Sequence, residues 1–200
     1  MVTATLLTLD QYFDLPDAAG LSYELIDGRV IEMSKPTFGH NAIGMRTGHL
    51  LTVVCERSFP DLMVSGDTNF ILGPGTVQAP DVVLLRRSVL ESAGVYRGAL
   101  QCAPDLAVEI VSPNESSADL DDKVGNYLNA GTSTVWVIWP RRRHALVYHR
   151  NGSVQHVLPG QLLEAPELLP GTGISLDEVF ARVVELETTT GSKPVESDDD

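Results

Sequence analysis

Hydrophobic residues recur along the chain in two patterns, one with helical spacing and one of short continuous runs. The helical pattern predicts a long helix over residues 39–58 and a second helix over residues 118–129. Acidic residues in the first turns of the second helix, and Gly131 just after it, are typical helix boundaries. Thr8 and Gln11 form a capping box that predicts a short helix near the N-terminus.

The short apolar runs predict strands, and two of the turns between them predict β-hairpins. Asp27-Gly28 and Asn151-Gly152 each separate two apolar runs. Buried strands are also predicted at residues 81–85, at residues 106–112 and in the run TVWVIW. Helices and strands in this mixed order predict an α/β fold, with a mixed β-sheet flanked by helices and a hairpin toward each end of the chain.

Length and composition limit the number of domains and the kinds of partner. A chain of 200 residues with 43% hydrophobic content suits one domain, expected at residues 1–188, followed by an acidic disordered tail at residues 189–200. No run of 18 apolar residues is present and the first residues lack the features of a signal peptide, so a cytoplasmic protein without membrane contact is expected. The net charge of −13 argues against non-specific adhesion to nucleic acid, but it permits a local binding site.

Glu109 needs an explanation, because it stands in the middle of the apolar run at residues 106–112. A lone buried carboxylate costs on the order of several kcal/mol unless something compensates it. The segments APDVVLL and APDLAVEIV both place Pro-Asp at the start of an apolar strand, with Asp81 heading the first and Glu109 inside the second. If the strands are neighbours, the two carboxylates meet, and we predict that Mg²⁺ or Mn²⁺ is the compensating group.

Lys123 is the candidate for a cation that assists chemistry at such a metal site. Hydrolysis of a phosphodiester needs a group that orients the attacking water and offsets developing negative charge, and lysine can do this as a mobile point charge. Lys123 is the only lysine between Lys35 and Lys193, and it borders the apolar stripe of the helix predicted over residues 118–129. Its long side chain can reach back to the sheet.

Five segments resemble, in their order, those of the Uma-type restriction endonuclease family, which is part of the PD-(D/E)XK nuclease superfamily. They cover roughly residues 20–180 and are YELIDGRVIEM, QAPDVVLL, APDLAVEIVSP, DLDDKVGNYLNAGTSTVWVI and LLPGTGISLDEVF. The resemblance implies a restriction-endonuclease-like core and an endonuclease that hydrolyses DNA phosphodiester bonds with Mg²⁺ or Mn²⁺.

The resemblance also implies roles for individual residues. Asp81 and Glu109 match the metal ligands of the family. Lys123 matches a catalytic lysine that has moved from the strand to the helix, and Glu24 matches an accessory carboxylate. The chain departs from the family pattern after the WVI strand, where relatives often have an acidic residue and this chain has Arg141, so the departure concerns substrate contacts near the site.

The same four residues have structural explanations as well. Asp81 can form the turn into its strand, and Glu109 can pair with a buried arginine. Lys123 can be a solvated flank of its helix, and Glu24 can be an exposed hairpin carboxylate paired with Arg29.

Surface or capping roles are expected for His40 and His49 on the long helix. The run Arg141–Arg143 is expected to be a solvated turn or, if it lies near a cleft, a contact for phosphates.

Two functions from different classes fit these observations. The first is a metal-dependent endonuclease acting on DNA, and hydrolysis of another phosphate ester is a variant of it. The alternative is a catalytically inactive nuclease-fold binding or scaffold protein, with which the net charge of −13 agrees. A homodimer is compatible with both.

Overall fold

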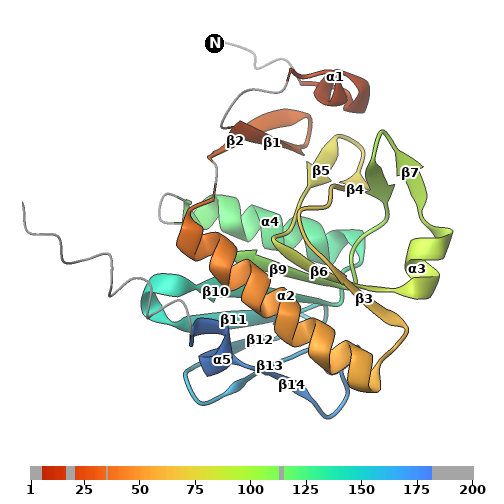
Figure 1. Ribbon diagram of the computed structural model, residues 1–200. Helices are drawn as coiled ribbons and strands as arrows, with labels where there is room; N and C mark the ends of the chain where they lie inside the picture. The colour runs from red at the N-terminus through yellow and green to blue at the C-terminus, as the bar shows by residue number, and fades with distance from the viewer. Residues whose placement is uncertain (1–5, 17–20, 35, 113–114, 182–200) are drawn as a thin grey trace, which may run out of the picture.

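A six-stranded mixed sheet forms the centre of the computed structural model, which describes residues 6–16, 21–34, 36–112 and 115–181 (Figure 1). The strand order is β12-β11-β10-β9-β6-β3, in which β9 and β10 run parallel and the other neighbours run antiparallel. These strands are β3 (Leu62–Ser65), β6 (Val82–Arg86), β9 (Leu106–Ile110), β10 (Thr134–Trp139), β11 (His144–His149) and β12 (Val154–Val157).

The two long helices cover opposite faces of this central sheet (Figure 1). On one face, α2 (Phe38–Ser58) packs apolar residues such as Leu51 into the cluster that contains Val108 of β9. On the other face, α4 (Ser117–Ala130) packs against Ala107 of the same strand. Successive residues of β9 therefore point into two different cores, which is why this strand reads as a continuous apolar run.

A second six-stranded sheet lies beyond α4 and holds the first hairpin (Figure 1). Asp27 (φ 49°) and Gly28 (φ 78°) form the hairpin turn, and two successive positive φ angles are what a tight two-residue hairpin requires. The strand order is β2-β1-β5-β4-β8-β7. These strands are β1 (Leu21–Ile26), β2 (Arg29–Ser34), β4 (Phe70–Gly73), β5 (Thr76–Gln78), β7 (Gly94–Tyr96) and β8 (Ala99–Gln101).

Short elements complete the described part of the fold. The apolar side chains of α5 close the α2 side of the core. The short elements are α1 (Leu9–Phe13), α3 (Arg87–Ser92), the 3₁₀ turn η1 (Pro140–Arg142), β13 (Leu162–Glu164), β14 (Gly173–Ser175) and α5 (Leu176–Phe180).

The structure confirms the predicted α/β class, the capping box of Thr8 with Gln11, both hairpins and both long helices within one residue at each end. Two details differ. The strands form two large sheets instead of one, and the strand predicted over residues 106–112 ends at Ile110. Pairing stops there because the chain turns toward α4, where the Ser112 N–H donates to the carboxylate of Glu115.

The end of the predicted domain at residue 188 and the acidic tail at residues 189–200 lie outside the described residues. None of the helices that the structure describes is both long enough and apolar enough to cross a membrane.

Candidate active site

Strand pairing brings Asp81 and Glu109 to one place. Val82 of β6 lies opposite Val108 of β9, so in this antiparallel register Asp81 lies opposite Glu109. Residues opposite each other in an antiparallel pair point to the same face of the sheet, and both carboxylates line one cavity. The predicted neighbourhood of the two strands is therefore confirmed. The Ile110 N–H donates to Asp81 Oδ2 at 2.7 Å and fixes that carboxylate.

Lys123 is buried at the centre of the site. Its residue is 5% exposed, and its Nζ lies 3.2 Å from Glu24 Oε1, 3.5 Å from Glu109 Oε2 and 3.9 Å from Glu115 Oε1. The helix places it there because Leu120 and Val124, which flank it in sequence, pack toward the sheet. The alternative of a solvated flank does not hold.

Glu24 reaches the site from the second sheet. It is 4% exposed on β1, and its Oε1 accepts a weak hydrogen bond from the Ala79 N–H at 3.4 Å in addition to its contact with Lys123. The alternative of an exposed hairpin carboxylate paired with Arg29 is therefore wrong. Glu24 Oε2 is buried and has no hydrogen-bond partner among the described residues, so one carboxylate oxygen at the site is free to accept a ligand.

The partners of Glu109 come from α4. Tyr127 donates its hydroxyl to Glu109 Oε1 at 2.7 Å, and Lys123 lies beside the other oxygen. The sequence led us to expect a metal ion as the compensating group, or a buried arginine as the alternative. Within the described residues the partners of Glu109 are a lysine and a tyrosine instead of an arginine, because the helix delivers both side chains to the buried face of β9.

Two more residues of the site could not be assigned from the sequence. His40 lies at the start of α2 with Nε2 2.8 Å from the Ile110 carbonyl oxygen and 3.4 Å from Asp81 Oδ2, so the expected surface or capping role does not describe it. His49 is exposed, as expected. Glu115 is the other addition. No local pattern marks His40, because its contact joins residues 70 positions apart. Tyr127, in contrast, could have been assigned from the sequence, because it lies four residues after Lys123 and therefore on the same face of the helix.

The electrostatics of the site show an excess of negative charge. Burial is the main reason that the pKa of Glu109 is raised to about 8, with Asp81 and Glu24 adding to the effect while Lys123 and Tyr127 oppose it. Burial also raises the pKa of Asp81, against the opposing effects of His40 and the Ile110 N–H.

Lys123 responds in the opposite way to the same surroundings. Burial alone would lower its pKa, but the carboxylates of Glu109, Glu24 and Glu115 outweigh burial and raise it. Together with Asp81, these groups place four carboxylates around one ammonium, so ionisation of all of them would leave three negative charges without a partner. A proton on Glu109 or a bound cation relieves that excess.

The donor set fits a hard divalent cation held with few protein ligands. Among the described residues, no three His, Cys, Asp or Glu side chains are arranged as a ready metal cluster. Mg²⁺ commonly takes one or two carboxylates and completes its shell with water and substrate phosphate. Asp81 and Glu109 supply two carboxylates on one face, and the excess negative charge around them favours a cation.

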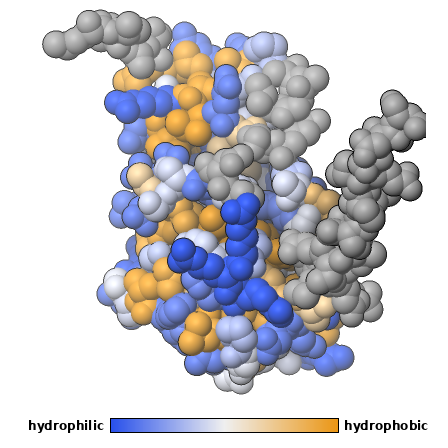
Figure 2. Space-filling view, turned by 90° about the vertical axis from the view of Figure 1, so that its left-hand side faces the viewer, coloured by the Kyte–Doolittle hydropathy of each residue, from blue (hydrophilic) through white to orange (hydrophobic). Residues whose placement is uncertain are grey.

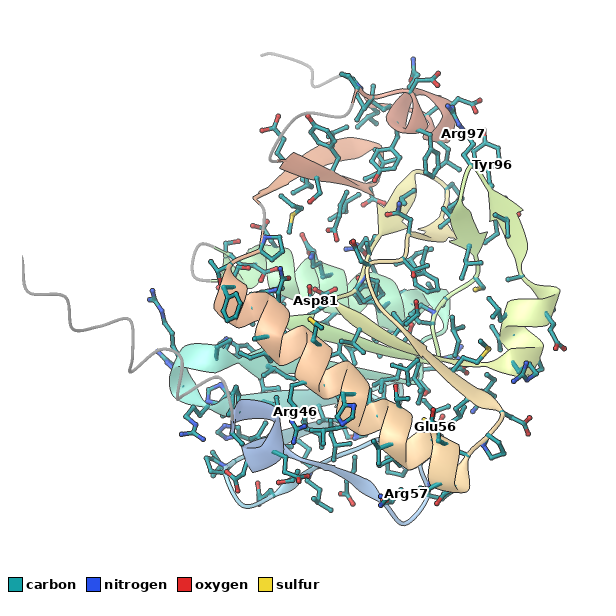
Figure 3. The ribbon with its side chains drawn as sticks, viewed as in Figure 1. Arg46, Glu56, Arg57, Asp81, Tyr96 and Arg97 are labelled. Atoms are coloured by element: carbon teal, nitrogen blue, oxygen red, sulfur yellow. The ribbon has the colours of Figure 1, made fainter. Side chains whose placement is uncertain are left out.

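Two cavities open onto the site, and both are lined by Lys123 and Glu24. One, of about 400 Å³, is lined by Asp81, Glu109 and His40. The other, of about 790 Å³, lies between the first hairpin and α4. Figure 3 shows Asp81 near the first turns of α2, and this residue lines the first cavity.

Comparisons with known proteins show the fold and the family of this chain. The crystal structure of a protein described as a putative nuclease belonging to DUF820, from Anabaena variabilis, is similar to this chain with a TM-score of 0.76. The match covers 88% of this chain and 99% of that chain at 22% sequence identity, which shows a common fold. No curated protein matches the chain. A family model described as "Putative restriction endonuclease" matches residues 9–177. The chain therefore belongs to the Uma2 family.

Proposed function

We propose that this protein is a metal-dependent endonuclease that hydrolyses DNA phosphodiester bonds. The observation that supports it best is the buried Lys123, whose ammonium lies within 3.9 Å of three carboxylates contributed by β1, β9 and the segment before α4. Burying these charges costs stability, so such an arrangement is expected where the charges serve catalysis.

Asp81 and Glu109 would hold the cation, for which Mg²⁺ or Mn²⁺ fits the oxygen donors. The cation would supply Lewis-acid stabilisation and activate water when bound. The Ile110 N–H fixes Asp81, and the Tyr127 hydroxyl fixes Glu109, so the chain holds both carboxylates in place.

Lys123 is suited to stabilise the negative charge that develops on the phosphate during attack by water. Its raised pKa keeps it protonated at neutral pH, and Glu24 holds its Nζ at 3.2 Å. A fixed positive charge in a buried site stabilises a developing negative charge far better than the same charge in water. Glu24 therefore acts as a positioning residue for the lysine.

The direct test is nicking of supercoiled plasmid by the purified protein with Mg²⁺, with Mn²⁺ and with a chelator. Cleavage should require metal and should disappear in Glu109→Gln. Glu56→Gln is the matched control, because Glu56 is exposed near the far end of α2 (Figure 3).

A catalytically inactive binding protein is the second candidate. It is favoured by the finding that both oxygens of Glu109 already have partners within the described chain. Absence of nicking with either metal, together with binding of DNA that does not differ between wild type and Glu109→Gln, would support this candidate over the endonuclease.

A further inference from the structure

The run Arg141–Arg143, called the arginine turn below, lies at the same edge of the central sheet as the candidate site. β9 and β10 are parallel, Ile138 is paired with Ile110, and the Val111 N–H donates to the Ile138 carbonyl at 2.9 Å. Both strands therefore end at one edge. The arginine turn begins three residues after Ile138 and is exposed throughout.

The arginine turn supplies positive charge at an edge where negative charge is in excess. The chain has 27 acidic and only 14 lysine and arginine residues, and the site itself has more carboxylates than cations. A polyanionic substrate would be repelled unless cations stand close by. Figure 2 shows strongly hydrophilic side chains gathered on the lower half of the face that includes the end of the β10–β11 turn.

The arginine turn is also held on a definite side of the sheet. The guanidinium of Arg143 lies over the ring of Phe180 in α5, with its central carbon 5.6 Å from the ring centroid. Phe180 belongs to the core cluster on the α2 face. The exposed acidic residues Asp119 and Asp122 belong to α4, which covers the opposite face. Arg143 is therefore held toward the α2 side of this edge, the side from which His40 reaches Asp81.

We propose that the arginine turn binds the phosphate backbone of the DNA substrate beside the cleaved bond, an inference that rests on the proposed endonuclease function. β10 ends at Trp139, two residues before Arg141, and its Val137 is paired with Glu109, so the turn follows directly after the strand beside the site. One DNA strand has a phosphate about every 3.4 Å along the helix axis, so several phosphates of a duplex held at the site lie along this edge. Arginine suits this task because its planar fork can donate two hydrogen bonds to a phosphate.

Contacts of this kind position the duplex without reading its sequence. The departure from the family pattern at Arg141 thus acquires a function.

The test measures DNA binding in a Glu109→Gln background, so that binding is observed without cleavage. Arg141→Ala, Arg142→Ala and Arg143→Ala are combined, and affinity for a short duplex is measured by fluorescence anisotropy over a range of salt concentrations. Each phosphate contact contributes about 0.9 to the slope of log affinity against log salt, so the slope should fall by roughly 2 to 3. Binding should weaken equally for duplexes of unrelated sequence.

A matched control removes the same charge from the opposite edge. Arg57, Arg87 and Arg150 are exposed at the end of α2, at the start of α3 and in the β11–β12 turn. Replacing all three with alanine should leave the salt slope unchanged. Because Arg143 packs on Phe180, a double variant that replaces Arg141 and Arg142 alone leaves this packing in place and should show about two thirds of the change in slope.

Each outcome decides the proposal. A selective loss of slope in the arginine-turn variants supports it. An equal loss in both sets, no loss in either, or a response limited to binding of anionic lipid vesicles overturns it. If wild-type protein nicks plasmid while the slope is unchanged, only this inference fails. If wild-type protein shows neither nicking nor DNA binding, the proposed function fails as well.

Discussion

The tripeptide Ala-Pro-Asp occurs before two neighbouring strands, and its aspartate has a different environment in each. Asp81 precedes β6, accepts from the Ile110 N–H, lies 3.4 Å from His40 Nε2 and is 26% exposed in its side chain. Asp105 precedes β9, accepts from both the backbone N–H and the guanidinium of Arg86, and is only 10% exposed.

Strand direction explains the difference. β6 and β9 are antiparallel, so the residues before them lie at opposite edges of the central sheet. The edge with Asp81 also receives Lys123 and His40, and we call it the site edge. The edge with Asp105 receives Arg86, and we call it the far edge. Asp81 keeps an accessible oxygen, which a candidate metal ligand needs. Both oxygens of Asp105 are engaged by Arg86, which is typical of a structural residue.

The largest expected effect comes from exchanging each aspartate for asparagine. Asp81→Asn should abolish plasmid cleavage and leave unfolding stability unchanged or slightly higher, because burial makes the Asp81 carboxylate unfavourable in the absence of a cation. Asp105→Asn should lower the unfolding free energy by about 1–3 kcal/mol, from weakened charge-assisted hydrogen bonds, and keep cleavage. Urea unfolding and plasmid nicking on both variants check this. Loss of cleavage in a fully stable Asp105→Asn would contradict it.

Removal of the lysine at the site edge should have the next largest effect. Lys123→Ala should lower the single-turnover cleavage rate by roughly 100-fold or more, as expected for one preorganised electrostatic group. Lys123→Arg should restore little, because a planar fork does not replace a point charge.

Loss of Lys123 should also destabilise the fold by about 3–5 kcal/mol, because Glu24 and Glu109 then remain buried without a cation. This loss should shrink at low pH, where the carboxylates are protonated. Metal titration should show little change in affinity. Cleavage close to that of wild type would show that Lys123 has a structural role alone.

A smaller effect is expected from Glu109→Gln on the pH dependence of stability. The folded-state pKa of Glu109 is about 8, above the unfolded value of about 4.3. The folded protein therefore binds the proton more tightly, and in the absence of metal the stability of wild type should fall as pH rises between these two values. The slope from this group is at most about 1.4 kcal/mol per pH unit.

The glutamine variant should lack this decline, and its stability relative to wild type should increase steadily from about pH 4.3 to about pH 8. Thermal melts in a chelating buffer across this range make the comparison, with Glu56→Gln as the exposed control. A large loss of stability at neutral pH in Glu109→Gln would identify Glu109 as a structural partner of Lys123 and not as a metal ligand.

The smallest effect is expected at the far edge from Arg86→Ala. The Arg86 side chain is 44% exposed, so its ion pair with Asp105 should contribute only about 0.2–1 kcal/mol, and less at high salt. The backbone N–H of Arg86 still donates to Asp105 in this variant. Urea unfolding at two salt concentrations measures the effect. A larger loss of unfolding free energy in Arg86→Ala than in Asp105→Asn would contradict this prediction, because the guanidinium would then contribute more than both contacts of Asp105 are expected to.

Part of the candidate site was predictable from the sequence because its signals are local. Glu109 interrupts an apolar strand, and Lys123 is the single lysine of a helix whose apolar stripe is plain. Glu24 was assigned only through the family resemblance, since its contact with Lys123 joins the second sheet to α4. His40 and Glu115 were not assigned, because neither interrupts a pattern in its own segment.

The sequence by itself determined the two long helices, the two hairpins and the buried strands of the central sheet, because hydrophobic periodicity, capping and turn residues act over a few positions. It also determined that a carboxylate would be buried in β9. Only the tertiary structure decided which end of each strand faces the site, that Lys123 and Tyr127 are the chain's own partners for Glu109, and that the arginine turn lies at the site edge. These depend on strand direction and on packing between segments distant in the chain, and no local pattern encodes either.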